Sequence, residues 1–186
     1  MSATGHTSVP SQSIPDKQSR RALDPPVTAV TLLTQELVAY AQNYARSSSR
    51  SRVILPLHKS ASDPLQRMLN AMEPGTYVQP HRHSSPPKAE SIVVLTGAIC
   101  FVMFDEDGNV KQMFDIIAGS PTFGIDVEAG IYHTFFPLVS GTVVFEAKPG
   151  PYFAADDKDF AVWAPKEGSP GVTSYLEMLS NLREKL

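Results

Sequence analysis

Hydrophobic and polar positions alternate with a period of two from Arg52 to about residue 148, which is typical of β-strands with one buried face. The alternation is divided by turn signals such as Asp105-Glu106-Asp107-Gly108-Asn109. We expect about eight short strands: 53–57, part of 69–83, 90–104 with an interruption at 96–97, 110–117, 123–127, 131–136 and 142–148. No helical pattern intervenes, so the sequence predicts an all-β sandwich or barrel.

Helical patterns flank this strand region on both sides. Residues 31–45 carry an apolar stripe at helical spacing, made of Leu32, Leu33, Leu37, Val38 and Ala41, and residues 172–186 form a second amphipathic pattern. The first 26 residues are rich in Ser, Thr and Pro and are predicted to be a disordered tail. We therefore expect a tail (1–26), a helix packed on the barrel (27–50), the barrel domain (51–165) and a C-terminal helix (166–186).

Composition narrows the classes of function. The net charge is -3, and residues 53–186 carry ten basic and sixteen acidic groups without a basic stripe, which argues against a nucleic-acid partner. No apolar run has the length of a membrane span and no secretory signal is visible, so we expect a cytoplasmic protein without a membrane partner. The single Cys100 lies in an apolar run, where a reduced thiol is expected and a nucleophile is not.

One stretch, residues 75–97, carries the clearest chemistry. His81 and His83 are two residues apart and project to the same face of a strand, and Glu90 can return to that face from the next strand. His133 lies on a later strand and would complete the set. Three imidazoles and one carboxylate suit one divalent transition metal: Fe, Mn, Ni, Co or Zn. Glu90 can alternatively accept a hydrogen bond from a ligating histidine or act as a general base.

Further side chains are candidates for contact with a substrate. Tyr77 and Gln79 share strand parity with His81 and can face the interior, and Tyr77 joins Glu90 as a candidate catalytic residue, although Tyr77 can equally be packing. The remaining substrate-binding candidates are Lys88 beside the hairpin tip, Phe135 on the face of His133, and His58, which can equally lie on the surface. Arg82 has the opposite parity and should point outward.

These motifs resemble those of the cupins. Gly75-x5-His81-x-His83-x6-Glu90-x6-Gly97 is close to the first cupin motif, and Glu128-Ala129-Gly130-x2-His133 is close to the second. The resemblance covers about residues 50–165 and implies a jelly roll of two packed antiparallel sheets whose motifs supply a three-histidine, one-glutamate metal site. The chain departs from the pattern in its longer interval from His83 to Glu90, in Glu128 for the usual proline, and in Pro137 where many cupins have asparagine.

More narrowly, the chain resembles the WbuC-type cupin fold metalloproteins. The matching features are MEPGTYVQPHRH, the PPKAE that follows, the AGIYHT turn, the FEAKPGPY strand end and KDFAVWAP. This resemblance implies a bacterial protein of surface-polysaccharide metabolism, and its reaction type is left open.

The hypotheses from the sequence fall into different classes. The first is a metal-dependent isomerase, epimerase or lyase acting on a sugar or sugar derivative. Alternatives are a non-catalytic metal-assisted sugar-binding or sensing module, an iron-dependent dioxygenase on a small polar substrate, and a metal-free epimerase that uses a histidine as base. Because sheet edges are commonly covered by pairing between chains, a homodimer is also expected.

Overall fold

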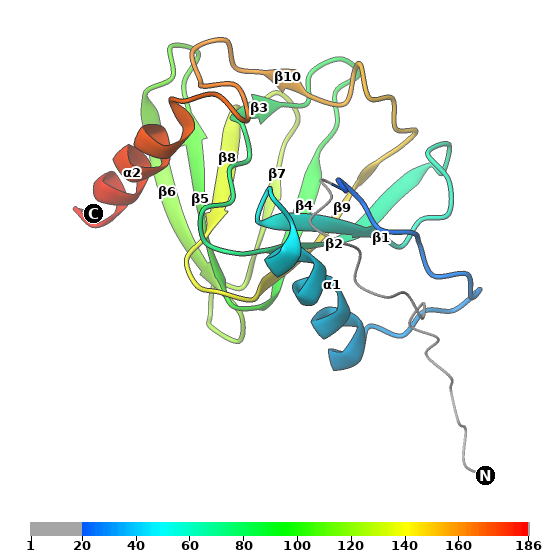
Figure 1. Ribbon diagram of the computed structural model, residues 1–186. Helices are drawn as coiled ribbons and strands as arrows, with labels where there is room; N and C mark the ends of the chain where they lie inside the picture. The colour runs from blue at the N-terminus through cyan, green and yellow to red at the C-terminus, as the bar shows by residue number, and fades with distance from the viewer. Residues whose placement is uncertain (1–19, 186) are drawn as a thin grey trace.

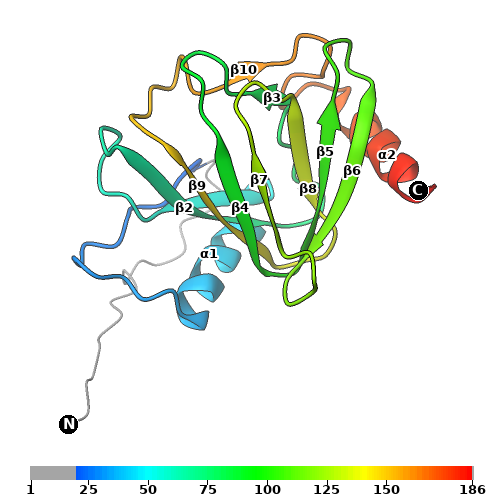
Figure 2. The ribbon, with the colours of Figure 1, turned by 180° about the vertical axis from the view of Figure 1, so that it is seen from behind.

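The computed structural model describes residues 20–185, which form two five-stranded antiparallel sheets (Figures 1 and 2). The first sheet has the order β1 (Arg52–Pro56), β2 (Leu65–Met72), β9 (Thr142–Pro149), β4 (Glu90–Thr96) and β7 (Gly124–Val127). The second has the order β10 (Asp159–Phe160), β3 (His81–Arg82), β8 (His133–Pro137), β5 (Ala98–Phe104) and β6 (Val110–Ile117). The predicted all-β jelly roll with flanking helices is confirmed.

The two sheets pack face to face through alternate side chains. Met72, Val144 and Ile92 from the first sheet meet Phe101 and Phe135 from the second in one buried cluster. The parity of these residues defines the inner faces. Because alternate residues of a strand point to the same side, Glu90 on β4 and the polar residues near the end of β9 also lie on the inner faces.

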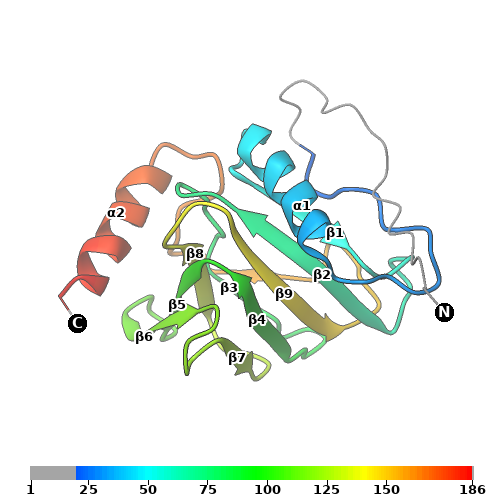
Figure 3. The same cartoon turned by 90° about the horizontal axis from the view of Figure 1, so that it is seen from below.

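A helix covers the outer face of each sheet (Figure 3). Helix α1 (Gln35–Ser47) buries Leu37 and Ala41 against the outer face of β1, β2 and β9, and α2 (Val172–Arg183) buries Leu179 against β5 and β8. Helix α1 begins later than predicted because the Thr34 hydroxyl accepts a hydrogen bond from the backbone N–H of Leu37 and caps it. The expected apolar stripe loses its first two members, Leu32 and Leu33, which are about half exposed.

The strand pattern differs from the prediction in several places. Strand β2 begins at Leu65, before the predicted start at residue 69. Within residues 69–83 a break or bulge is expected at Pro74–Gly75, but the interruption is longer, because β2 ends at Met72 and residues 73–80 are irregular up to Pro80. A strand of only two residues, β10, was not predicted, because Asp159–Phe160 is too short to show a period. Strand β10 pairs with β3 at one end of the barrel, where it lies across the top of Figure 1.

Most of the predicted disordered tail, residues 1–26, lies outside the described residues. Its last part, residues 20–26, packs along β1, where Ala22 bridges Ile54 and the Leu23 side chain is buried against the α1 cluster. Within residues 20–185, no helix is long and apolar enough to cross a membrane. Cys100 is fully buried under α2, and burial raises the pKa of its thiol to about 12.

Candidate metal centre

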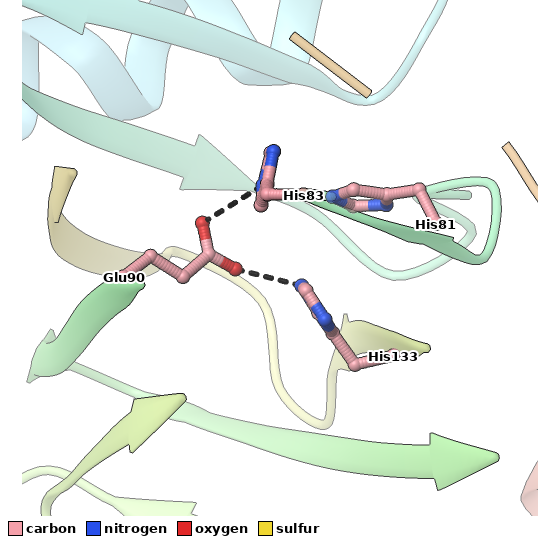
Figure 4. A group of neighbouring side chains, drawn as sticks. All are labelled: His81, His83, Glu90 and His133. Carbon is pink, nitrogen blue, oxygen red and sulfur yellow. Dashed lines mark ion pairs between the residues drawn. The ribbon is translucent and has the colours of Figure 1, made fainter. Parts of the chain in front are cut away.

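Four side chains meet between the sheets at the end of the barrel next to β10 (Figure 4). His81 on β3 and His133 on β8 are directly paired across the second sheet, and His83 follows β3. Glu90 begins β4 in the opposite sheet and reaches across to them. One ligand atom from each residue lies within 4.8 Å of every other, and all four side chains are buried. The jelly roll therefore brings together the four residues that the sequence names as ligands.

Each imidazole is held by a backbone carbonyl on one side. Nδ1 of His81 lies 2.8 Å from the carbonyl oxygen of Gln79, and Nδ1 of His133 lies 2.9 Å from that of Ile131. Nδ1 of His83 contacts the carbonyl oxygen of Asp157. Because a carbonyl can only accept, Nδ1 must donate in all three rings, which leaves Nε2 of each neutral ring as an acceptor. This orientation prepares the Nε2 atoms for a metal.

Glu90 lies between two of these Nε2 atoms, as the dashed lines in Figure 4 show. Its Oε1 is 2.7 Å from Nε2 of His133, and its Oε2 is 3.4 Å from Nε2 of His83. In neutral rings with protonated Nδ1, neither side of these pairs carries a hydrogen. Accordingly, Nε2 of His83, Nε2 of His133 and Oε1 of Glu90 are buried without a hydrogen-bond partner. A cation between them would satisfy all three atoms, so this donor set fits a divalent metal.

The protonation of the cluster also suits a cation. Burial lowers the pKa of His81 well below its ordinary value, and the nearby charge of Lys158 lowers it further. Burial acts to raise the pKa of Glu90, but the hydrogen bonds and positive charge that His133 and His83 supply when their Nε2 atoms are protonated outweigh burial and hold the pKa well below the ordinary value. Neutral His81 and ionised Glu90 are the forms in which these residues bind metals.

A second cluster of buried charges lies beside the first and was missed by the sequence analysis. Lys148 Nζ is 2.8 Å from Asp157 Oδ2 and 3.8 Å from Glu146 Oε1, and Lys88 Nζ is 3.6 Å from Asp157 Oδ1. These four residues are at most 7% exposed. The parity of the last predicted strand could have placed Glu146 and Lys148 inside the barrel with Val144. Nothing local identifies Asp157, whose carbonyl contacts His83 from a loop.

Tyr77, predicted to face the site, does not face it. Its hydroxyl donates to the carbonyl of Pro165 at 2.6 Å, and its ring packs edge-on against Tyr175 of α2, outside the second sheet. The prediction failed because it extended the alternation of β3 backward through residues 73–80, which are not a strand. The hydrogen bond to Pro165 and the packing against α2 give Tyr77 a structural role.

Two other candidates also lie away from the four ligands. The Gln79 side chain accepts a hydrogen bond from the backbone N–H of Glu167 at 3.4 Å. Gln79 contributes to the site only through its backbone carbonyl, which contacts Nδ1 of His81. His58 lies in the β1–β2 connection, where its Nδ1 is 2.8 Å from the backbone carbonyl oxygen of Arg67 and 3.1 Å from the backbone nitrogen of the same residue. Contact of either side chain with a substrate has no support in these positions.

The remaining candidates lie inside the barrel or behave as predicted. Lys88 is buried rather than exposed at a hairpin tip, and its Nζ donates to the carbonyl of Pro151 at 3.0 Å. Phe135 shares the inner face with His133 but packs in the central apolar cluster. Arg82 points outward as predicted, where its Nε donates to Asp159 at 2.7 Å and its guanidinium lies 4.3 Å from the ring centroid of Tyr132.

Comparisons with known proteins add a family match and a set of structural neighbours. Residues 33–116 match a family model described as a domain of unknown function, DUF6016. No curated protein matches the chain in sequence. Solved structures with a similar fold include Bacillus subtilis oxalate decarboxylase, at 19% identity and a TM-score of 0.43 over 53% of this chain. The similarity spans only 24% of that decarboxylase chain.

Two further structural neighbours have different functions. Cellulomonas parahominis L-ribose isomerase has 17% identity and a TM-score of 0.48 over 61% of this chain and 70% of its own. Staphylococcus aureus CapF, a capsular polysaccharide assembling protein, has 18% identity and a TM-score of 0.44 over 59% of this chain and 28% of its own. These neighbours are cupin-fold proteins, and the likeness concerns the fold alone.

Proposed function

We propose that this protein is a metal-dependent cupin enzyme, of isomerase, epimerase or lyase type, that acts on a sugar or sugar derivative in bacterial surface-polysaccharide metabolism. The observation that carries the proposal is the set of buried donor atoms without hydrogen-bond partners, Nε2 of His83 and His133 and Oε1 of Glu90, with His81 beside them. The assignment to polysaccharide metabolism is supported by the sequence resemblance to the WbuC type.

Some groups of the centre would bind the metal, and others fix the orientation of the metal-binding side chains. His81, His83, His133 and Glu90 would hold one divalent ion (Fe, Mn, Ni, Co or Zn), which when bound can polarise a substrate carbonyl or hydroxyl or acidify a water molecule. The backbone carbonyls that contact Nδ1 fix the ring orientations. Phe101 also stacks on His133, with 5.3 Å between ring centroids, and restricts its movement.

The first test is elemental analysis of the purified protein beside His81→Ala and His133→Ala. Wild type should contain about one metal ion per chain, and each variant should lose most of it, because three donors bind far more weakly than four. His58→Ala is the matched control, because His58 is a partly buried histidine bonded to Arg67 away from the cluster. Unchanged metal content in both site variants would show that the cluster does not bind metal.

The second test separates an enzyme from a binding module. Protein reloaded with iron, manganese, nickel, cobalt or zinc is incubated with candidate sugar nucleotides, and products are followed by chromatography. Turnover that disappears in His133→Ala supports the enzyme. Binding without product under every metal would favour a sugar-binding module instead. Oxygen uptake would identify a dioxygenase, and epimerisation without metal would identify a metal-free epimerase.

A further inference from the structure

The buried charged cluster beside the metal centre lies on the inner face of the barrel. Glu146 lies opposite Ile92 on the neighbouring strand, and Glu90 is the next inward residue of β4. The two carboxylates are therefore diagonal neighbours on one face, which is a separation of about 7–8 Å between backbone positions. A molecule bound at the metal centre would lie next to this cluster.

The loop between β9 and β10 closes the cluster. Asp157 pairs with Lys148 through its side chain, while its carbonyl contacts Nδ1 of His83. Two residues later, Asp159 is paired with Arg82 of β3. Lys158 is thus held between two residues that are both attached to the histidine strand.

Phe160 is paired with His81 and lies on the same face, with 6.1 Å between the two ring centroids, whereas Asp159 is bonded outward to Arg82. By the alternation of an extended chain, Lys158 lies on the side of Phe160 and therefore faces the site. After burial, its charge is the largest influence that lowers the pKa of His81, and it also acts on Glu90 and Glu146. Burial and the charge of Lys148 in turn lower the pKa of Lys158. Lys158 therefore lies close to both clusters, in surroundings that disfavour its charge.

The three ammonium groups in this part of the barrel differ in their ion pairs. Lys148 and Lys88 have ion pairs with Asp157, and Lys148 also approaches Glu146. Within residues 20–185, Lys158 has no hydrogen bond and no ion pair. Glu90 is already directed at the histidines. Lys158 consequently lies beside the metal ligands without a close ion pair of its own, and the carboxylates of Glu146, Glu90 and Asp157 act on its charge only from a greater distance.

A polar side chain without a partner points to a polar ligand as well. Asn70 lies on the inward face of β2, is 5% exposed, and its Oδ1 has no hydrogen-bond partner. Oδ1 of Asp157 is also buried without a hydrogen bond, although the Lys88 ammonium lies 3.6 Å from it as an ion pair, which leaves the Asn70 oxygen as the atom without a partner. Buried polar atoms of this kind are costly unless a ligand or water satisfies them.

We propose that Lys158 is a specificity-determining residue that binds the anionic group, a carboxylate or a phosphate ester, of the small molecule taken by the metal centre. Its ammonium donates a charge-assisted hydrogen bond to that group, while Asn70 accepts from a hydroxyl of the same molecule. This inference rests on the proposed function and narrows it from sugars in general to acidic or phosphorylated ones.

The test is calorimetric titration of the metal-loaded full chain with glucuronate, glucose 1-phosphate and neutral glucose at constant ionic strength. Both anions, or one of them, should bind wild type more tightly than glucose does. Lys158→Met should weaken anion binding by about ten- to a hundredfold, the usual effect of losing a hydrogen bond to a charged group. Lys158→Arg should restore part of the affinity. The arm that binds identifies carboxylate or phosphate as the source of the charge.

Lys111→Met is the matched control, since Lys111 is an exposed lysine on β6 and its loss removes the same charge from the surface. Equal anion affinity in Lys158→Met and wild type, or no preference for either anion over glucose, would overturn the inference. Metal content is measured in the same samples. Retained metal with unchanged anion binding refutes only the role of Lys158, whereas absent metal refutes the proposed function.

Discussion

At the residue scale, the ligand set was predictable because it depends only on spacing. His81 and His83 share a face through the period of two, and that period holds locally even in a very short strand. Strand parity could have placed Lys148 inside the barrel, but the burial of Lys88 was not predictable, because Lys88 looks exposed in a proline-rich tip and is buried only by contacts with Pro151 and Asp157. Tyr77 was misplaced because the period was extended into irregular chain.

A substitution at Tyr77 distinguishes the structural role from the predicted catalytic one. Tyr77→Phe should lower the free energy of unfolding by about 1 kcal/mol, because the Pro165 carbonyl loses its buried donor, and should leave metal content and turnover unchanged. Urea unfolding and elemental analysis measure the two effects. Tyr152→Phe, at an exposed tyrosine, serves as control. A large loss of turnover with unchanged stability would return Tyr77 to the active site.

At the element scale, the long strands were predictable from alternation and the short ones were not. Strand β10 exists because residues on β3 attract it: Asp159 and Phe160 pair with Arg82 and His81, and the Arg82 guanidinium binds Asp159 and Glu106. No pattern within two residues can encode such a strand. The start of α1 was also predicted incorrectly. Leu32 and Leu33 extend the apolar pattern, but the helix begins after them because the Thr34 hydroxyl caps it.

Removing the Arg82 side chain should detach β10 selectively. In Arg82→Ala the exchange of the Ala161 amide, which donates to Pro80, should accelerate about fivefold, consistent with the loss of roughly 1 kcal/mol from partly exposed ion pairs. Hydrogen exchange followed by mass spectrometry measures this rate. Arg183→Ala on α2 removes a comparable ion pair with Asp115 of β6 and should leave β10 unaffected. Equal acceleration at Ala161 in both variants would contradict the assignment.

At the scale of the whole molecule, strand count and spacing predicted the jelly roll, but they did not predict the ion pairs that join the chain after α1 to the chain before α2. Arg50 and Arg52, at the start of the barrel, both bind Glu167, which precedes α2. Residues so distant in sequence carry no common pattern, so only the folded chain reveals the contact. The expected homodimer remains a prediction that sedimentation analysis can test.

The Glu167 contact predicts a pH dependence of stability. Burial acts to raise the pKa of Glu167, but the hydrogen bond from Arg50 and the charge of Arg52 outweigh it, so its pKa lies below the ordinary 4.5. A carboxylate with a lowered folded pKa stabilises the fold above its unfolded pKa, and this contribution disappears as the pH falls through the folded pKa.

Glu167→Gln should therefore lower the free energy of unfolding by about 1 kcal/mol near neutral pH, and by almost nothing at strongly acidic pH. The value at neutral pH is small because Glu167 is partly exposed to solvent. Urea unfolding across the acidic range measures the difference. Glu177→Gln on α2 is the control, since Glu177 has no ion pair in the part of the chain that the structure describes. A Glu167→Gln deficit that does not shrink with falling pH would contradict the ion pair as its cause.

The two-residue strand β3 has a thermodynamic consequence. His81, and His83 just beyond the strand, face the metal centre, while Arg82 between them holds β10 from outside, and His83 contacts the Asp157 carbonyl. For a metal held by these histidines, its affinity and the closure of residues 157–160 would be linked equilibria with one coupling free energy. If opening of the loop weakens metal binding by a given factor, then removal of the metal must lower the equilibrium constant for loop closure by the same factor. Cells short of the metal would hold a more open, more easily cleaved protein.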